Sequence, residues 1–96
     1  MTQFQNDLAG HRFTQDIADA GGVLRRVRAD YRLRDGVYEL LHVEADPALR
    51  GTGAAGRFMQ TLSDHARAEG LKLAPHCGYA VAWFKRHPDE GDLLAA

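Results

Sequence analysis

The sequence lacks several features that mark large classes of protein. It has one cysteine, Cys77, so it cannot form an internal disulfide, which is typical of a reducing compartment. No apolar run approaches the ~20 residues of a membrane span, and residues 1–7 lack the basic-then-apolar order of a signal peptide. The net charge of −1 gives no strong field toward nucleic acid or a membrane. We therefore expect a cytoplasmic protein that binds neither.

The residues that are present suit one small globular domain. The chain has 96 residues, of which 45% are hydrophobic and 26% are charged. It contains no repeat, low-complexity tract or linker, and no metal site is predicted. We expect a flexible lead-in at residues 1–10 and a single domain at residues 11–96. A small domain with exposed sheet edges is expected to be a monomer or a weak homodimer.

A glycine-rich turn before a helix-forming stretch lies near the middle of the chain. Free N–H groups and the dipole at a helix start attract anions. Gly51 and Gly53 would let a phosphate approach the main chain, and they can adopt positive φ. Arg50 adds a planar charged fork suited to phosphate oxygens. This stretch therefore predicts a diphosphate site.

Two common phosphate motifs do not explain this turn. A P-loop needs Gly-Lys followed by Ser or Thr, which is absent here. Gly51, Gly53 and Gly56 fit the dinucleotide spacing, but the strand expected at 71–74 is followed by Pro75 rather than an acid. The pattern Arg-x-x-Gly-x-Ala, formed by Arg50, Gly53 and Ala55, fits better.

Alternation of apolar and polar residues predicts three antiparallel strands. A weak pattern covers 11–18, and the clearest covers 23–34. The Asp35-Gly36 turn then leads to a third strand at 37–44, with Tyr38, Leu40, His42 and Glu44 expected on one face. The arginines of the second strand could form a nucleic-acid surface, but acidic residues elsewhere balance them, which favours a solvated face; these arginines are Arg26, Arg28, Arg32 and Arg34.

Helical periodicity predicts two main helices on this sheet. The first covers about 53–69, ends at Gly70 and places Ser63 on its wet side. Its expected buried stripe is Ala54, Ala55, Phe58, Met59, Leu62 and Ala66. A short fourth strand follows at 71–74, then a helix at about 79–87 and a last helical turn near 92–94. The expected fold class is α+β: a three-strand meander plus a fourth strand, mostly antiparallel, with two helices packed on it.

Several spaced motifs appear in one order over most of the chain. They are Tyr31-Arg32-Leu33, His42-Val43-Glu44, Pro47-x-Leu49-Arg50-Gly51-x-Gly53-x-Ala55, His65-Ala66-Arg67, Gly70-Leu71-Lys72, Pro75-x-Cys77-x-Tyr79 and Arg86-His87-Pro88. Together they resemble the small single-domain branch of the GNAT N-acetyltransferase superfamily. The chain departs from that pattern at Val43, His76 and Gly78, where the family usually has threonine, an apolar residue and proline.

The resemblance implies acetyl-coenzyme A (acetyl-CoA) as the cofactor. Its diphosphate would lie on the backbone N–H groups of the loop residues, and its pantetheine arm would run beside the third strand near Val43. The thioester would lie near Cys77. Lys85, Arg86 and His87 either reach the phosphates or complement a helix C-terminus. The loop residues are Arg50, Gly51, Thr52, Gly53, Ala54 and Ala55.

The same resemblance suggests three catalytic candidates. Cys77 is a nucleophile, a neighbour of the coenzyme sulfur or simply a small buried residue. His42 and Glu44 are candidate general bases, against roles as a hydrogen-bonded strand residue and a solvated strand end. The predicted function is acetyl transfer to an amine, on a protein or peptide because the acceptor site should be open. The alternative is a coenzyme A-binding module with little or no catalysis.

Overall fold

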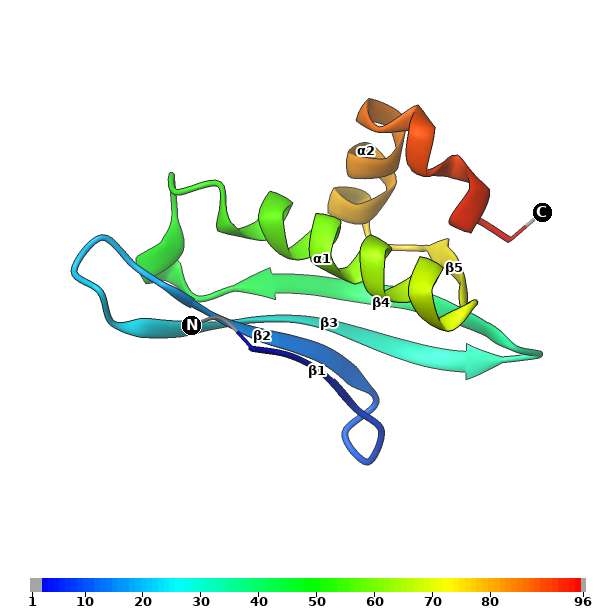
Figure 1. Cartoon of the computed structure of the whole chain (residues 1–96), viewed down its shortest axis with the longest axis horizontal. Helices are drawn as coiled ribbons and strands as arrows, with labels where there is room; N and C mark the ends of the chain where they lie inside the picture. Colours follow the sequence, from blue (N-terminus) through cyan, green and yellow to red (C-terminus); the bar gives the residue numbers. More distant parts are fainter. Residues whose placement is uncertain (1–2, 96) are drawn as a thin grey trace.

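The computed structural model describes residues 3–95 and forms a five-stranded sheet with two main helices. Its elements, in chain order, are β1 Gln3–Asp7, β2 Arg12–Ala18, β3 Leu24–Arg34, β4 Val37–Ala45, the 3-10 turn η1 Pro47–Leu49, α1 Ala54–Glu69, β5 Lys72–Pro75, α2 Gly78–Arg86 and the 3-10 helix η2 Pro88–Leu93. The expected α+β class is confirmed in this arrangement (Figure 1).

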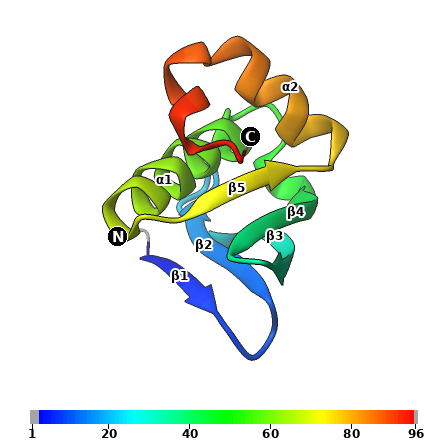
Figure 2. The same cartoon turned by 90° about the vertical axis from the view of Figure 1, so that its right-hand side faces the viewer.

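The strands follow one another across the sheet in sequence order, β1-β2-β3-β4-β5. The first three junctions are antiparallel, and β5 pairs with β4 in parallel. Both α1 and α2 lie on the same side of the sheet (Figures 1 and 2), so within the described residues the opposite face carries no helix. No helix among residues 3–95 has the length and apolar character to cross a membrane.

The expectation of four strands is corrected to five, because part of the stretch expected to be a loose lead-in forms β1. Its residues pair with β2, with Phe4 opposite Gln15. The Phe4 ring stacks on Phe13 at 5.8 Å between centroids and lies 5.0 Å from the His65 ring of α1. One aromatic anchor thus holds an otherwise polar segment at the sheet edge. Met1 and Thr2 lie outside the described residues.

A β-bulge in β4 changes which side chains face the core. Asp30 of β3 pairs with His42, whereas the next residue, Tyr31, pairs with Leu40, so Leu41 has no partner. The extra residue shifts the alternation beyond it. The prediction that Leu40, His42 and Glu44 share a face is therefore wrong: Leu40 is buried, whereas the two polar residues are exposed.

The core forms between the sheet and the apolar sides of the helices. The predicted apolar stripe of α1 is buried at Ala54, Phe58, Met59, Leu62 and Ala66, and α2 adds Ala80, Trp83 and Phe84. Ala55 is only half-buried, because it lies in the cavity at the helix start.

One residue of α1 departs from the predicted pattern. Ser63 was expected on the wet side but is fully buried, because it lies one turn from Gln60 and Arg67, whose side chains contact Glu90 of η2, so that η2 covers this side of the helix. At the end of the helix, Gly70 adopts φ +70° and its N–H bonds back to the carbonyls of Ala66 and Arg67, as a helix-ending glycine should.

Candidate functional site

A cavity of about 260 Å³ opens at the N-terminus of α1. The end of β4, the glycine-rich loop and the first turn of the helix form its wall, and Tyr79 of α2 closes one side. Its lining residues are 45–47, 49–51, 53–56 and Tyr79. The stretch that the sequence predicted to hold a diphosphate therefore surrounds a concave site.

Hydrogen bonds within the loop use every second N–H group. Arg50 N–H donates to the Pro47 carbonyl and Thr52 N–H to the Leu49 carbonyl, both at 3.1 Å. Ala54 N–H donates to Thr52 Oγ1 at 3.2 Å. Within residues 3–95, the intervening N–H groups have no partner, which leaves donors for a ligand; they belong to Gly51, Gly53 and Ala55.

The conformation of the loop requires its glycines. Gly51 and Gly53 have φ of +81° and +76°, a region that other residues rarely adopt. Gly53 is the N-cap of α1, no side chain caps it, and the first turn contains no acidic residue. The partial positive charge of the helix start is therefore not offset by its own first turn. Loop geometry and helix dipole both favour an anion in this cavity.

Charged side chains around the cavity hold the loop in place. Arg57 donates from Nη1 to the Thr52 carbonyl at 2.7 Å, while Arg50 is exposed on the cavity wall. Asp46 also lines the cavity, but one of its oxygens accepts the Ala48 N–H at 2.8 Å and caps η1. The Asp46 carboxylate in the cavity wall thus already has a structural partner.

The predicted loop residues play different parts. Arg50, Gly51, Gly53, Ala54 and Ala55 line the cavity. Thr52 does not, and its hydroxyl instead donates to the Leu49 carbonyl at 2.6 Å and accepts the Ala54 N–H. Thr52 therefore shapes the loop.

Two other predicted coenzyme contacts, Lys85 and His87, lie outside the lining of this cavity. The imidazole of His87 donates from Nδ1 to the Trp83 carbonyl at 2.7 Å and stacks on the indole at 4.0 Å between centroids. This ring is therefore held by α2 itself. Lys85 is exposed near the end of the same helix.

Tyr79 was not predicted to contact the loop. Its hydroxyl lies 3.9 Å from the position that a Cβ on Gly56 would take. Burial raises the pKa of this phenol, and the Arg86 charge opposes the rise. Tyr79 and Arg86 are two turns apart on α2. Of the basic residues in the last turn of this helix, Arg86 is the one whose charge acts on Tyr79. Tyr79 appears in the sequence only as an aromatic after Cys77, and its position depends on how α2 packs on α1.

Cys77 lies where β4 and β5 part. Their pairing ends at Leu40 and Pro75, and the N–H groups of His76 and Cys77 then both donate to the Leu40 carbonyl, at 2.9 and 3.2 Å. The Cys77 side chain is half-buried against the core at the start of α2. The structure thus places the cysteine at the opening between the two strands.

Three backbone N–H groups lie near the Cys77 thiol. Burial alone would raise its pKa, but N–H groups of Ala80, Val43 and Tyr79 favour the thiolate and bring the pKa below its ordinary value of 9.0. Since Val43 belongs to β4 and the other two to the first turn of α2, the sulfur lies in the gap between these elements. The structure therefore brings together Val43 and Cys77, two residues that the sequence singled out.

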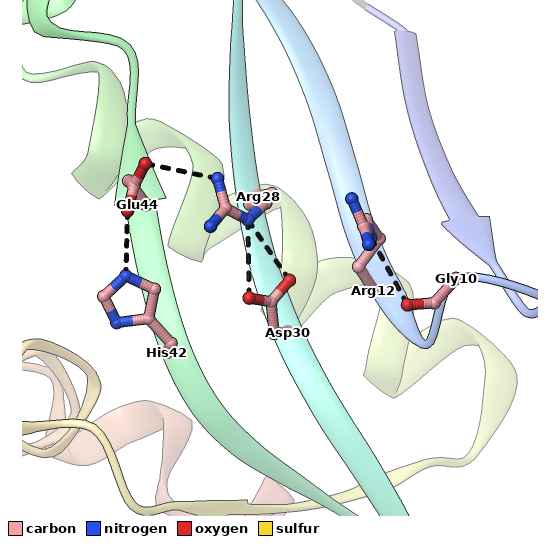
Figure 3. Close-up of polar contacts among 6 residues, drawn as sticks. All are labelled: Gly10, Arg12, Arg28, Asp30, His42 and Glu44. Carbon is pink, nitrogen blue, oxygen red and sulfur yellow. Dashed lines mark hydrogen bonds and ion pairs between the residues drawn. The ribbon is translucent and has the colours of Figure 1, made fainter.

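His42 and Glu44 lie on the sheet face without helices. Figure 3 shows a row of polar side chains there: His42 Nε2 is 3.0 Å from Glu44 Oε1, and Glu44 Oε2 accepts from Arg28 Nη1 at 3.2 Å. Arg28 also pairs with Asp30 at 3.2 Å. The hydrogen bond with His42 and the Arg28 charge lower the pKa of Glu44. Because Cys77 packs on the core side, the three predicted catalytic residues do not form one cluster.

The strand arginines have carboxylate partners. Their shortest pairs are Arg26–Asp16 at 2.8 Å, Arg28–Asp30 at 3.2 Å, Arg32–Glu39 at 2.7 Å and Arg34–Glu39 at 3.9 Å. Four guanidinium groups therefore share neighbouring acids on the same face. This pairing supports the interpretation as a solvated strand face rather than a nucleic-acid surface.

Comparison with known proteins places this geometry in a family. The family model described as GCN5-related N-acetyl-transferase matches residues 15–93. The solution structure of a GCN5-like protein from Staphylococcus aureus aligns with a TM-score of 0.60 and 16% identity, covering 98% of this chain and 88% of that one. No curated protein matches the chain significantly. The family model covers most of the chain, so this protein belongs to the GCN5-related N-acetyltransferase family.

Proposed function

We propose that this chain is an acetyl-CoA-dependent N-acetyltransferase whose loop cavity binds the coenzyme's diphosphate. The observation that carries the proposal is the set of N–H groups on Gly51, Gly53 and Ala55 at the start of α1, which have no partner within residues 3–95. Glycine at two of these positions leaves room for phosphate oxygens to reach the main chain. Arg50 adds charge at the cavity wall.

The opening between β4 and β5 is the proposed place for the reaction. The coenzyme, when bound, supplies an acetyl group activated as a thioester. The Val43 N–H, which turns toward the Cys77 sulfur here, would stabilise negative charge on the reacting carbonyl oxygen. Cys77 would either lie beside the coenzyme's sulfur or, as a thiolate, take the acetyl group itself, with the coenzyme's S–C(acyl) bond breaking and coenzyme A leaving as the thiolate.

His42 is the proposed base that removes a proton from the acceptor amine. The imidazole is exposed on a strand next to Val43, and Glu44 fixes the ring through a hydrogen bond of 3.0 Å. Glu44, with its pKa lowered by His42 and Arg28, stays ionised and is better suited to hold the imidazole than to accept a proton at neutral pH. The 53% exposed His42 side chain suits an amine carried by a protein or peptide.

Calorimetry with coenzyme A tests the binding step. Arg50→Glu places a carboxylate in the cavity and should abolish measurable binding, whereas Arg34→Glu makes the same charge change at the far hairpin and should not. Equal binding by both variants, or no binding by the natural chain, would remove the basis of the proposal.

A coenzyme A-binding module with little or no catalysis is the second candidate. It is favoured by one observation: His42 and Glu44 lie on the helix-free face, whereas Cys77 packs on the core side. Incubation with acetyl-CoA and a panel of lysine peptides separates the candidates. Tight binding without acetylated peptide would support the module, and an acetyl adduct on Cys77 in the mass spectrum would support the nucleophile role.

A further inference from the structure

A second concave surface lies away from the loop cavity, and three exposed leucines line it. Leu8, Leu33 and Leu41 have exposed fractions of 66%, 53% and 43%. Together with His11, Tyr31 and Arg32 they surround a volume of about 530 Å³, which we call the leucine groove. Exposed aliphatic residues that line one hollow indicate a binding surface more strongly than scattered ones.

The groove lies beside an open strand edge. Pairing of β2 with β3 ends at Arg12 and Asp30, and the last contact on that side is the Tyr31 N–H donating to the His11 carbonyl at 2.9 Å. Residues two apart in a strand turn their N–H and C=O groups to the same side, so those of Leu33 face the groove. Within residues 3–95, no strand pairs with this side of β3 beyond Tyr31. An extended peptide could hydrogen-bond there as an added strand.

Positive charge lies beside the groove, at Arg32, which lines it, and at Arg34, two residues further along β3. Arg32 and Arg34 both pair with the single carboxylate of Glu39, at 2.7 and 3.9 Å. His76 reaches the other oxygen of the same carboxylate at 3.7 Å. One negative charge therefore faces two guanidinium groups. Acidic side chains on a bound peptide would complement this excess.

Leu41 connects the groove to the proposed base. It is the unpaired residue of the β4 bulge, and the next residue along the chain is His42. Both side chains are exposed. A peptide seated against Leu41 would thus end beside the imidazole, where an amine has to lose its proton.

We infer that the leucine groove binds an extended segment of the acceptor protein in which apolar and acidic residues alternate, and that this segment delivers an amine to His42. The inference rests on the proposed function and names its substrate class. The apolar side chains lie on the leucines, the peptide backbone pairs with Leu33, and the acidic groups lie near Arg32 and Arg34.

Fluorescence anisotropy with labelled peptides tests the inference without requiring turnover. The first probe alternates leucine and glutamate before a lysine; in the second, serine replaces each leucine, and in the third, glutamine replaces each glutamate. The first should bind about tenfold more tightly than either of the others. Equal binding of all three, or no binding of the first, would overturn the inference.

Matched variants locate the binding surface. Leu33→Ser should weaken binding of the first probe about tenfold, and Leu24→Ser, at a leucine that is 51% exposed outside the groove, should leave it unchanged. Circular dichroism checks that both variants fold. Equal loss in both would overturn the inference. So would self-association in sedimentation that Leu33→Ser abolishes, because a second copy would then occupy the groove.

The failure of this inference is distinguishable from the failure of the proposed function. Arg34→Glu should weaken peptide binding and leave coenzyme A binding unchanged, whereas Arg50→Glu should do the reverse. If coenzyme A binds but the peptide does not discriminate, the groove assignment alone is lost. If Arg34→Glu and Arg50→Glu each change the binding of peptide and of coenzyme A alike, the two sites are not independent and the groove assignment fails as well.

Discussion

His42 Nε2 lies 3.0 Å from Glu44 Oε1 on the sheet face that carries no helix. Residues two apart in a strand share a face, and the bulge at Leu41 places both of them on the outer side of β4 rather than on the core side. Arg28 from β3 completes the arrangement by pairing with Glu44 at 3.2 Å. Both oxygens of the Glu44 carboxylate are thus engaged, one with His42 and the other with Arg28.

His42→Gln should raise the pKa of Glu44 toward its ordinary value of 4.5, because the largest cause of its lowering is the hydrogen bond with His42. Carbon-13 NMR of the Glu44 carboxyl group measures the change. If His42 is the base, the same variant should lower kcat/KM by about a hundredfold or more. Arg28→Gln serves as the control for catalysis, since it removes the Arg28 charge from Glu44 and leaves the imidazole in place. An unchanged Glu44 titration in His42→Gln would contradict the contact.

Gly51→Ala and Gly56→Ala should change stability in opposite directions. A Cβ at Gly51 meets no atom within 4 Å, but the φ of +81° would cost roughly 1–2 kcal/mol in any other residue. At Gly56, inside α1, a Cβ would make only an ordinary contact of 3.9 Å with the Tyr79 hydroxyl. Alanine there should gain up to about 1 kcal/mol of helix propensity. Urea unfolding measures both, and a shared sign would contradict the loop conformation.

The parts of this fold that local pattern determines were predictable. The α1 stripe from Ala54 to Ala66 repeats at helical spacing, and Gly70 ends the helix as a left-handed cap. Gly51 and Gly53 of the loop, which as glycines are free to adopt positive φ, do adopt it. In each case the determining residues lie within a few positions of one another.

The parts that depend on contacts distant in sequence were not predictable. β1 has Phe4 as its aromatic anchor, whose partners Phe13 and His65 come from β2 and α1. The bulge at Leu41 depends on how β3 and β4 align with each other. The alternating pattern within β4 alone gives no sign of it. Tyr79 reaches the cavity only because α2 packs on α1.

Cys77 should be alkylated by iodoacetamide with a pH midpoint below 9.0. Three backbone N–H groups favour the thiolate and outweigh the effect of burial. The chain has one cysteine, so mass spectrometry reports on this site alone. The urea-unfolded chain is the control, and its midpoint should be higher because those N–H groups are lost. A folded-state midpoint at or above that of the unfolded chain would show that burial dominates.

Arg67→Gln should destabilise the protein at pH 7 and have less effect near pH 3. The side-chain hydrogen bond from Arg67 lowers the pKa of Asp92 below its ordinary value of 3.8. A carboxyl group with a depressed folded-state pKa stabilises the fold above its unfolded value, and this stability is lost as pH falls through the folded value. Urea midpoints at pH 7 and 3 measure the difference.

Arg12→Gln is the matched control for this pH dependence. Its guanidinium contacts the Gly10 carbonyl at 3.3 Å and has no carboxylate partner among residues 3–95. The stability change that it causes should therefore be nearly the same at both pH values. A constant effect of Arg67→Gln over the same range would contradict the link between Arg67 and Asp92.

Ser63→Ala should leave stability unchanged or raise it by up to about 1 kcal/mol. Ser63 is fully buried, and among residues 3–95 its hydroxyl has no hydrogen-bond partner. Removing an unpaired buried hydroxyl ends a desolvation cost, and alanine is the better helix former. Leu62→Ala, at the neighbouring buried position, should instead cost about 2–5 kcal/mol and shows that the assay responds to core changes. A clear loss in Ser63→Ala, measured by urea unfolding, would mean that the hydroxyl has a partner such as a buried water.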